Sequence, residues 1–205
     1  MASINVTFSN AAMGKSPKVM HKIHAENKNI GIYKRDISHL QPEVKQCLDN
    51  NIEFHQSGSI QEIELALKKQ LNTYTPLIDD VMMLLQLFRE VSQSKSFKVL
   101  LANVNTNMCR RFHTDTNDLR LLCTYFGPGT IWLPEGGVNK EALKAYRGNS
   151  HIVTNTSLIQ QANTGDVLLL KGSLYHHDEA RAVVHRSPTI EESGKKRLLL
   201  RIDTN

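Results

Sequence analysis

The strongest constraint on the fold is a change of pattern after Ser96. From there to the C-terminus, short apolar stretches follow one another, separated by Gly, Pro and Asn turns such as Gly127-Pro128-Gly129. Short apolar stretches with frequent turn residues are typical of β-sandwiches and β-barrels. The predicted strands cover residues 97–104, 119–126, 130–133, 152–159, 167–170, 181–185 and 197–203.

The residues before this change show helical spacing instead. Ser59 and Glu62 form a capping-box pattern, and apolar residues follow it at helical spacing as far as Leu71. Thr75-Pro76 marks a second helix start, from which an apolar stripe continues to Val91. Shorter helices are predicted over 41–50 and 140–146, and a strand over 29–37.

This order of elements predicts an α+β chain built on a double-stranded β-helix, that is, a jelly-roll or cupin-like barrel, with N-terminal helices packed on it. Residues 1–27 are polar and aperiodic, so we expect them to be disordered in part. Residues 28–205 are expected to form a single domain, with a helical part over 28–95 and the jelly-roll core over 96–205.

Composition excludes several classes of protein. The chain is 40% hydrophobic and 22% charged, which is ordinary for a globular protein. Its net charge of +5 is spread out and forms no basic stripe, so a nucleic-acid partner is not expected. No apolar run is long enough to cross a membrane, and no secretory signal pattern is present, so we expect a cytoplasmic protein. The three cysteines form no CxxC pair and predict neither disulfides nor a zinc ribbon.

The candidate chemistry begins at His113 and Asp115. In an extended segment, residues two apart point to the same face, so both side chains could reach one point. An imidazole nitrogen and a carboxylate oxygen are two of the three ligands in the 2-His-1-carboxylate triad, which binds Fe(II) and leaves positions open for a co-substrate and O₂. His185 is the candidate for the third ligand, because it ends an apolar strand and precedes a turn.

An arginine that binds a carboxylate is expected downstream. In residues 197–203 the charged side chains alternate with apolar ones, and an arginine inside a barrel mouth would need a partner. The dicarboxylate 2-oxoglutarate would pair bidentately with Arg197 or with Arg201. The order HxD, Gly-Asp turn and strand, His, then Arg is that of an Fe(II)- and 2-oxoglutarate-dependent dioxygenase.

Four further residues are candidates for the same site. Arg120 lies in the middle of an apolar strand, so it is expected either to hold the co-substrate carboxylate or to pair with an internal Asp. Tyr125 is another candidate for co-substrate binding, although Tyr125 and Thr124 face opposite sides of one strand and only one of them can face the site. Arg186 and Ser187 follow His185 directly, and they either orient that ligand or form a turn.

A second cluster of metal-binding residue types, His176-His177-Asp178-Glu179, is interpreted as a solvated loop between strands. Cysteine catalysis is not expected, because Cys123 lies in an apolar strand and is typical of a buried thiol. Ser187 lacks the G-x-S-x-G context of a nucleophilic serine.

Four motifs carry a resemblance to a known family: FHTD at 112–115, LRLLCTYFGPGT at 119–130, GDVLLLKG at 165–172 and HRSP at 185–188. The chain resembles an uncharacterised bacterial family, a domain of unknown function with the motifs FHxD, LRLLCTYxGPGT, GDVxLLKG and HRSP. That family is similar to the 2-oxoglutarate oxygenases, so the resemblance implies a divergent oxygenase of this kind. One departure is Ile131, which stands where an acidic residue is expected after GPGT.

The leading hypothesis is therefore an Fe(II)- and 2-oxoglutarate-dependent dioxygenase with His113, Asp115 and His185 as metal ligands and 2-oxoglutarate as a small-molecule co-substrate. The alternative is a zinc-binding or metal-handling cupin-like protein without redox chemistry, because the same ligands bind Zn(II) readily. A third hypothesis is a protein–protein interaction module in which the motif residues are structural. The primary substrate and the oligomeric state stay open at this stage.

Overall fold

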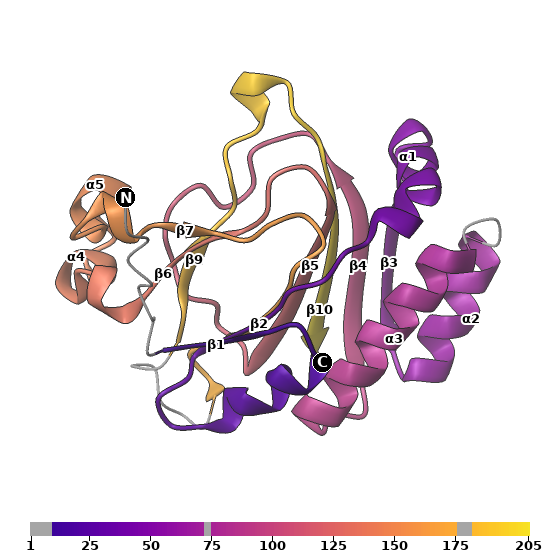
Figure 1. Cartoon of the computed structure of the whole chain (residues 1–205), viewed down its shortest axis with the longest axis horizontal. Coiled ribbons are helices and arrows are strands. Elements are labelled where there is room, and N and C mark those ends of the chain that lie inside the picture. Colours follow the sequence, from indigo (N-terminus) through magenta and orange to yellow (C-terminus); the bar gives the residue numbers. More distant parts are fainter. Residues whose placement is uncertain (1–9, 72–74, 176–181) are drawn as a thin grey trace.

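The computed structural model describes residues 10–71, 75–175 and 182–205. Within these residues, seven strands form a large sheet and three form a small one, and the large sheet is antiparallel apart from the β1–β2 pair (Figure 1). In spatial order the large sheet contains β1 (Ala11–Gly14), β2 (Ile30–Tyr33), β8 (Val167–Lys171), β5 (Leu119–Phe126), β10 (Arg197–Thr204), β4 (Phe97–Val104) and β3 (Glu53–Gly58). The small sheet contains β7 (Gln160–Gln161), β6 (Ile131–Leu133) and β9 (Val184–Arg186).

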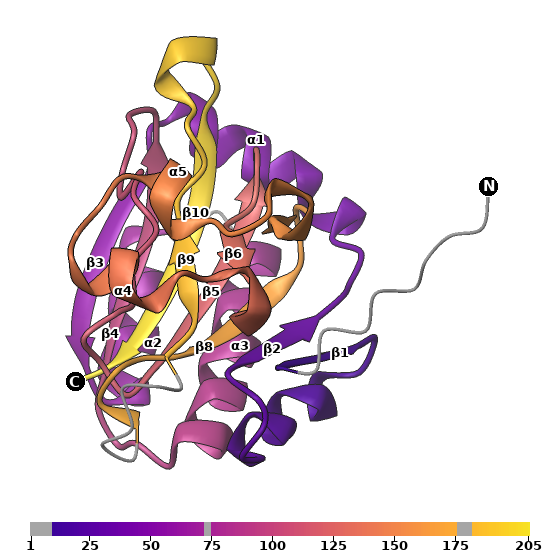
Figure 2. The same cartoon turned by 90° about the vertical axis from the view of Figure 1, so that its left-hand side faces the viewer.

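The helices lie outside both sheets. Three long ones, α1 (Gln41–Asp49), α2 (Ile60–Gln70) and α3 (Thr75–Ser92), cover the large sheet, whereas α4 (Lys140–Lys144) and α5 (Asn149–Ile152) lie beyond the small sheet (Figures 1 and 2). Short 3₁₀ helices connect the strands: η1 (Pro17–His24), η2 (Ser38–Leu40), η3 (Glu135–Gly137), η4 (Thr156–Leu158) and η7 (Glu191–Ser193). No helix among the described residues is both long and apolar enough to cross a membrane.

The two faces of the large sheet pack against different parts of the molecule, because side chains alternate along each strand. One face packs under the helices, and β5 contributes to it Leu119, Leu121, Cys123 and Tyr125. The other face looks toward the small sheet, where Leu122 and Leu199 pack with Trp132 of β6. Arg120, Thr124, Arg197, Arg201 and Asp203 share the parity of Leu122 and Leu199 along β5 and β10. The alternation therefore gathers polar groups between the sheets.

Most elements agree with the sequence predictions. Strands 97–104 and 119–126 are confirmed at both ends, and the capping box at the start of α2 is present, with Ser59 and Glu62 bonded to each other's backbone N–H. The strand predicted over 152–159 is wrong: that stretch contains the end of α5 and the turn η4. The Asn155 side chain accepts a hydrogen bond from Ser157 N at 2.9 Å, which favours a turn over an extended chain.

The N-terminal segment contributes two elements to the described structure. Of the segment 1–27, residues 10–27 include β1 and η1, and Val19, Met20 and Ile23 of η1 are buried in the main core. Ser16 caps η1, and Pro17 occupies its first turn. No helix was predicted over these residues because the eight residues of η1 hold only three buried apolar positions, too few to establish a period.

Candidate metal centre

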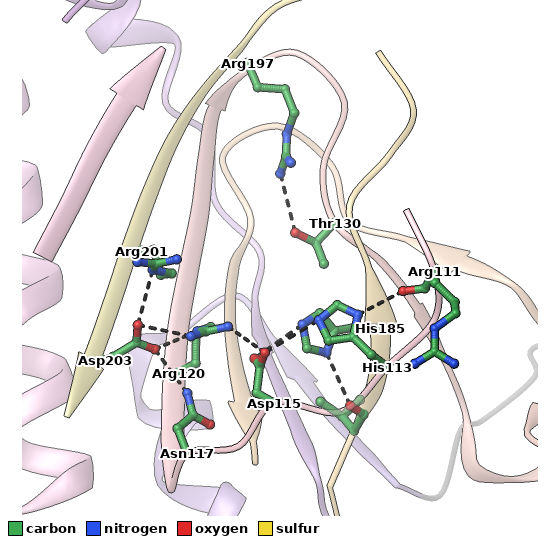
Figure 3. A network of polar contacts seen from close by, with 11 residues as sticks. Arg111, His113, Asp115, Asn117, Arg120, Thr130, His185, Arg197, Arg201 and Asp203 are labelled. Atoms are coloured by element: carbon green, nitrogen blue, oxygen red, sulfur yellow. Dashed lines mark hydrogen bonds and ion pairs between the residues drawn. The ribbon is translucent and has the colours of Figure 1, made fainter. Parts of the chain in front are cut away.

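Two histidines meet where the HxD segment joins the small sheet. His113 and His185 form an isolated antiparallel bridge, with His113 N donating to His185 O at 3.0 Å and His185 N donating to His113 O at 2.9 Å. Side chains paired across such a bridge lie on the same face. Asp115 follows two residues after His113, and all three side chains converge between the sheets (Figure 3).

The three side chains form a compact donor set. Asp115 Oδ1 lies 3.6 Å from His113 Nε2, and Asp115 Oδ2 lies 3.4 Å from His185 Nε2. One ligand atom from each residue lies within 4.8 Å of the other two. Two imidazoles and one carboxylate in this arrangement could hold a divalent transition metal and leave further coordination positions open.

Hydrogen bonds to backbone carbonyls select the tautomers of both histidines. Arg111 O accepts from His113 Nδ1 at 2.9 Å, and Val183 O lies 3.3 Å from His185 Nδ1. Because a carbonyl only accepts, each Nδ1 carries the proton in the neutral ring, and each Nε2 presents its lone pair toward Asp115. A metal-binding histidine is oriented by this kind of contact.

The carboxylate is fixed at one oxygen and left free at the other. Arg120 Nη1 contacts Asp115 Oδ1 at 2.6 Å, whereas Asp115 Oδ2 is buried without a hydrogen-bond partner among the described residues. A buried, unpartnered carboxylate oxygen is costly. The unpartnered Asp115 Oδ2 therefore supports a site in which this oxygen binds a cation.

The protonation states suit metal binding. Burial lowers the pKa of His185 to about 4, so its ring is neutral near pH 7. Burial would raise the pKa of Asp115, but the contacts with His113, His185 and Arg120 lower it to about 2. When its ring is protonated, His113 can donate a hydrogen bond to Asp115, and this raises the pKa of His113, so a metal would compete there with a proton.

Arg120 contacts acidic residues of the protein. Its Nε donates to Asp203 Oδ1 at 2.6 Å and its Nη2 donates to Asp203 Oδ2 at 3.2 Å, while Nη1 holds Asp115. The prediction that Arg120 binds a co-substrate is therefore corrected in favour of the internal pairing. Asp203 was missed by the sequence analysis, although its place opposite Arg120 in the β5–β10 register is the relevant signal.

Arg197, in contrast to Arg120, has no acidic partner among the described residues. It is about 1% exposed, and its Nη2 donates to the hydroxyls of Thr124 at 3.0 Å and Thr130 at 3.5 Å. Its Nε is buried without a partner, and no carboxylate among the described residues pairs with it. Burial lowers the pKa of Arg197 to about 10. Figure 3 shows its guanidinium extending from β10 toward Thr130, on the same side as the three candidate ligands.

Arg201 and Tyr125 do not share this environment. Arg201 lies four residues further along β10, where its Nε is 3.2 Å from Asp203 Oδ2 and the side chain is partly exposed. Tyr125 faces the helices, and its hydroxyl donates to Asp80 Oδ2 at 2.6 Å. The prediction that Tyr125 binds the co-substrate is wrong, because strand parity places Thr124 between the sheets instead.

The residues after His185 also lie elsewhere than predicted. Arg186 donates to Ser187 O at 2.9 Å and lies over the Phe112 ring, and Ser187 N bonds to Cys109 O. The His185 ring takes its orienting bond from Val183 O, so the prediction that Arg186 and Ser187 orient it is corrected in favour of the turn. Ile131 packs in the outer apolar cluster beside α5, where an acidic side chain would be buried. The run 176–179 lies outside the described residues.

Comparison with known proteins places the chain in a family. A family model described as "Protein of unknown function (DUF1826)" matches residues 14–203. The chain belongs to this family. The family predicted from the four motifs is thereby confirmed, and the DUF1826 match extends well upstream of them. Among curated proteins, no sequence matches this DUF1826 member.

Solved structures similar to this DUF1826 chain include several oxygenases. AtDAO1 from Arabidopsis thaliana, a dioxygenase for auxin oxidation solved as a 2-oxoglutarate complex, has a TM-score of 0.54 at 10% identity, and the likeness covers 94% of this chain and 91% of that one. T7H of Neurospora crassa with α-KG gives a TM-score of 0.48 at 11% identity, covering 92% and 78%. A prolyl-4-hydroxylase from Pseudomonas putida gives 0.45 at 9% identity, covering 92% and 98%. The first likeness shows a shared fold.

Proposed function

We propose that this protein is an Fe(II)- and 2-oxoglutarate-dependent dioxygenase in which His113, Asp115 and His185 hold the metal and Arg197 binds the distal carboxylate of 2-oxoglutarate. The observation that carries the proposal is the buried Arg197 guanidinium, which has no counter-ion among the described residues and lies between the same two sheets as the triad. The proposal takes these two sheets as the halves of a jelly-roll barrel, which the likeness to the Arabidopsis dioxygenase supports.

The donor set fits a ferrous ion. Both Nε2 atoms present lone pairs, and Asp115 Oδ2 lacks any other partner. Two nitrogens and one oxygen are the ligand set of non-haem iron oxygenases. Arg120 acts behind Asp115, where its contact with Oδ1 at 2.6 Å keeps the carboxylate ionised and orients it between the two histidines.

Arg197 fits a dicarboxylate for a complementary reason. A buried guanidinium is expensive unless an anion pairs with it. Thr124 and Thr130 supply hydroxyls next to it, which are groups that could share a bound carboxylate. Arg201 is less suited to this role, because Asp203 already lies beside it.

Bound Fe(II) and 2-oxoglutarate would supply oxidation of a substrate C–H bond by O₂, with 2-oxoglutarate converted to succinate and CO₂. The protein's own contribution is positioning and exclusion of water. The apolar side chains of Leu122, Trp132 and Val183 pack between the sheets, and they keep the surroundings of the polar groups dry.

Anaerobic titration of the Fe(II)-loaded protein with 2-oxoglutarate tests the proposal. We expect a weak visible charge-transfer band that saturates with 2-oxoglutarate and is absent in His113→Ala. In Arg197→Gln the band should appear only at 2-oxoglutarate concentrations about two orders of magnitude higher, since losing a buried charge partner costs about 3 kcal/mol.

Arg201→Gln is the matched control, because it removes the same charge from the same face of β10. It should titrate like the wild type. Absence of the band in wild-type protein that holds stoichiometric iron would contradict the dioxygenase proposal, and zinc would then be the first metal to test.

A further inference from the structure

A pocket of about 600 Å³ opens beside the candidate metal centre, and His113 forms part of its wall. Arg111 and Thr114 line it beside His113, as do residues of α4 and of the turn after it. Arg197 is not among its lining residues. A volume of this size suits a small molecule. The pocket is therefore separate from the proposed 2-oxoglutarate site yet reaches one of the proposed metal ligands.

The charges in this pocket do not cancel. Glu135 and Lys140 pair with each other at 2.9 Å. Arg111 and Lys144 have no acidic partner among the described residues, and Arg111 Nη1 is buried without a hydrogen bond. Among the described lining residues, two positive groups are thus in excess, and Arg111 has a buried donor without an acceptor. An anion is the ligand that satisfies such a donor.

The structure also holds Arg111 in place. The first residue of α5, Asn149, accepts a hydrogen bond from Phe112 N at 2.8 Å and donates one to Arg110 O at 3.0 Å, so it bonds the backbone on both sides of Arg111. The Arg111 guanidinium lies 4.6 Å from the centre of the Tyr146 ring. A guanidinium that is already positioned loses less entropy when it binds a carboxylate.

The rest of the lining is apolar or aromatic. Leu133, Val138 and Leu143 contribute aliphatic surface, and Tyr146 is exposed at the rim. Figure 3 shows Arg111 on the side of His113 away from Asp115. A ligand whose anionic group meets Arg111 would therefore have an apolar body alongside these side chains and one end next to His113.

We propose that this pocket binds the primary substrate, and that this substrate is a small organic carboxylate held by Arg111. Its identity as a substrate rests on the proposed dioxygenase function, whereas the selective binding of a carboxylate in the pocket does not.

Binding of phenylacetate and of its uncharged isostere phenylacetamide to the Zn(II)-supplemented protein, followed by NMR titration, tests the inference. Wild type should bind phenylacetate at least tenfold more tightly than phenylacetamide. Arg111→Gln should lose that preference, and Arg111→Lys, which keeps the charge, should retain part of it. Arg89→Gln is the matched control, because it removes one exposed positive charge from α3, which covers the other face of the large sheet (Figure 1). This variant should bind like the wild type.

Two outcomes would overturn the inference: equal binding of the two probes by wild type, or an unchanged preference in Arg111→Gln. Loss of the preference in Arg197→Gln, with Arg111 intact, would also do so, because it would place the anion at Arg197. The Fe(II)–2-oxoglutarate band, recorded on the same variants, separates the two proposals. A missing band with an intact Arg111-dependent preference counts against the dioxygenase alone, and a normal band without the preference counts against the pocket alone.

Discussion

Two buried arginines, Arg35 and Arg197, lie on opposite sides of the large sheet and differ in their partners. On the helix side, Arg35 donates to both oxygens of Asp80 and to Gly165 O at 3.0 Å. Between the sheets, the hydrogen bonds of Arg197 within the described part of the chain go to the hydroxyls of Thr124 and Thr130. Burial opposes the charge of both. The hydrogen bond to Asp80 nevertheless raises the pKa of Arg35, whereas burial lowers the pKa of Arg197 to about 10.

The difference separates a structural role from a binding role. The Arg35–Asp80 pair joins the loop after β2 to α3, and Tyr125 adds a third hydrogen bond to the same carboxylate. Its hydrogen bonds are complete without any ligand. In the cluster between the sheets, Arg197 Nε and Asp115 Oδ2 are buried without a hydrogen-bond partner among the described residues, as are Arg201 Nε and Asn117 Oδ1 near Asp203. Arg197 has no described acidic residue beside it, so it suits an anion, whereas the Asp115 oxygen suits a cation.

The largest expected effect comes from breaking the complete pair. Asp80→Asn should lower the free energy of unfolding by about 3–5 kcal/mol, because it leaves the Arg35 charge buried and unpaired. Urea denaturation of the metal-free protein measures this. Arg197→Met is the counterpart on the other side of the sheet, and it should be neutral or stabilising. If both variants lose stability equally, the two arginines have the same role and the comparison fails.

Acid should weaken the inter-sheet cluster in a defined pH range. In the metal-free protein the pKa of His185 is about 4 when folded and about 6.5 when unfolded, so the unfolded chain binds an extra proton between these values. Stability should therefore fall as the pH drops from 6.5 to 4, by on the order of 3 kcal/mol at 1.36 kcal/mol per pKa unit.

The contributions of His113 and Asp115 do not change between pH 6.5 and pH 4. His113 has a raised pKa, so its contribution is already complete below pH 6.5. Asp115, with its pKa lowered to about 2, loses its contribution only below about pH 4. His185→Gln should remove most of the slope when the urea midpoint is measured at pH 6.5, 5.5 and 4.5, and an unchanged slope would contradict the assignment.

Strand spacing explains which residues of the candidate site could be predicted from the sequence. His113 and Asp115 were found because two-residue spacing in an extended segment brings side chains to one face, and His185 because it ends an apolar strand. Strand parity alone could also have separated Arg120 and Thr124 from Tyr125, which was wrongly assigned to the site. Parity cannot separate Arg197 from Arg201, since both lie on one face of β10. The sequence does place Asp203 two residues after Arg201 on that face, but only the folded chain brings Thr130 beside Arg197.

Ligand binding should sharpen the comparison further. If Arg197 binds the distal carboxylate of 2-oxoglutarate, this ligand at one hundred times its dissociation constant should raise the unfolding free energy of the Fe(II)-loaded protein by about 2.7 kcal/mol. Anaerobic thermal unfolding with and without 2-oxoglutarate measures the gain. Arg197→Gln should show little gain at the same concentration. An equal gain in both proteins would place the binding site elsewhere.

The smallest effect is expected at Arg201, which lies on the inter-sheet face but is paired and about a third exposed. Its Nε is 3.2 Å from Asp203 Oδ2 without hydrogen-bond geometry, and Arg120 already holds both oxygens of that carboxylate. Arg201→Gln should therefore change the unfolding free energy by less than about 1 kcal/mol, as is usual for a solvent-exposed ion pair. It should leave the 2-oxoglutarate dissociation constant within about fivefold of wild type, since less than 1 kcal/mol is at stake. A larger loss of affinity, measured by the same anaerobic titration, would transfer the carboxylate-binding role from Arg197 to Arg201. It would also show that exposure and pairing do not distinguish a binding arginine from a structural one in this sheet.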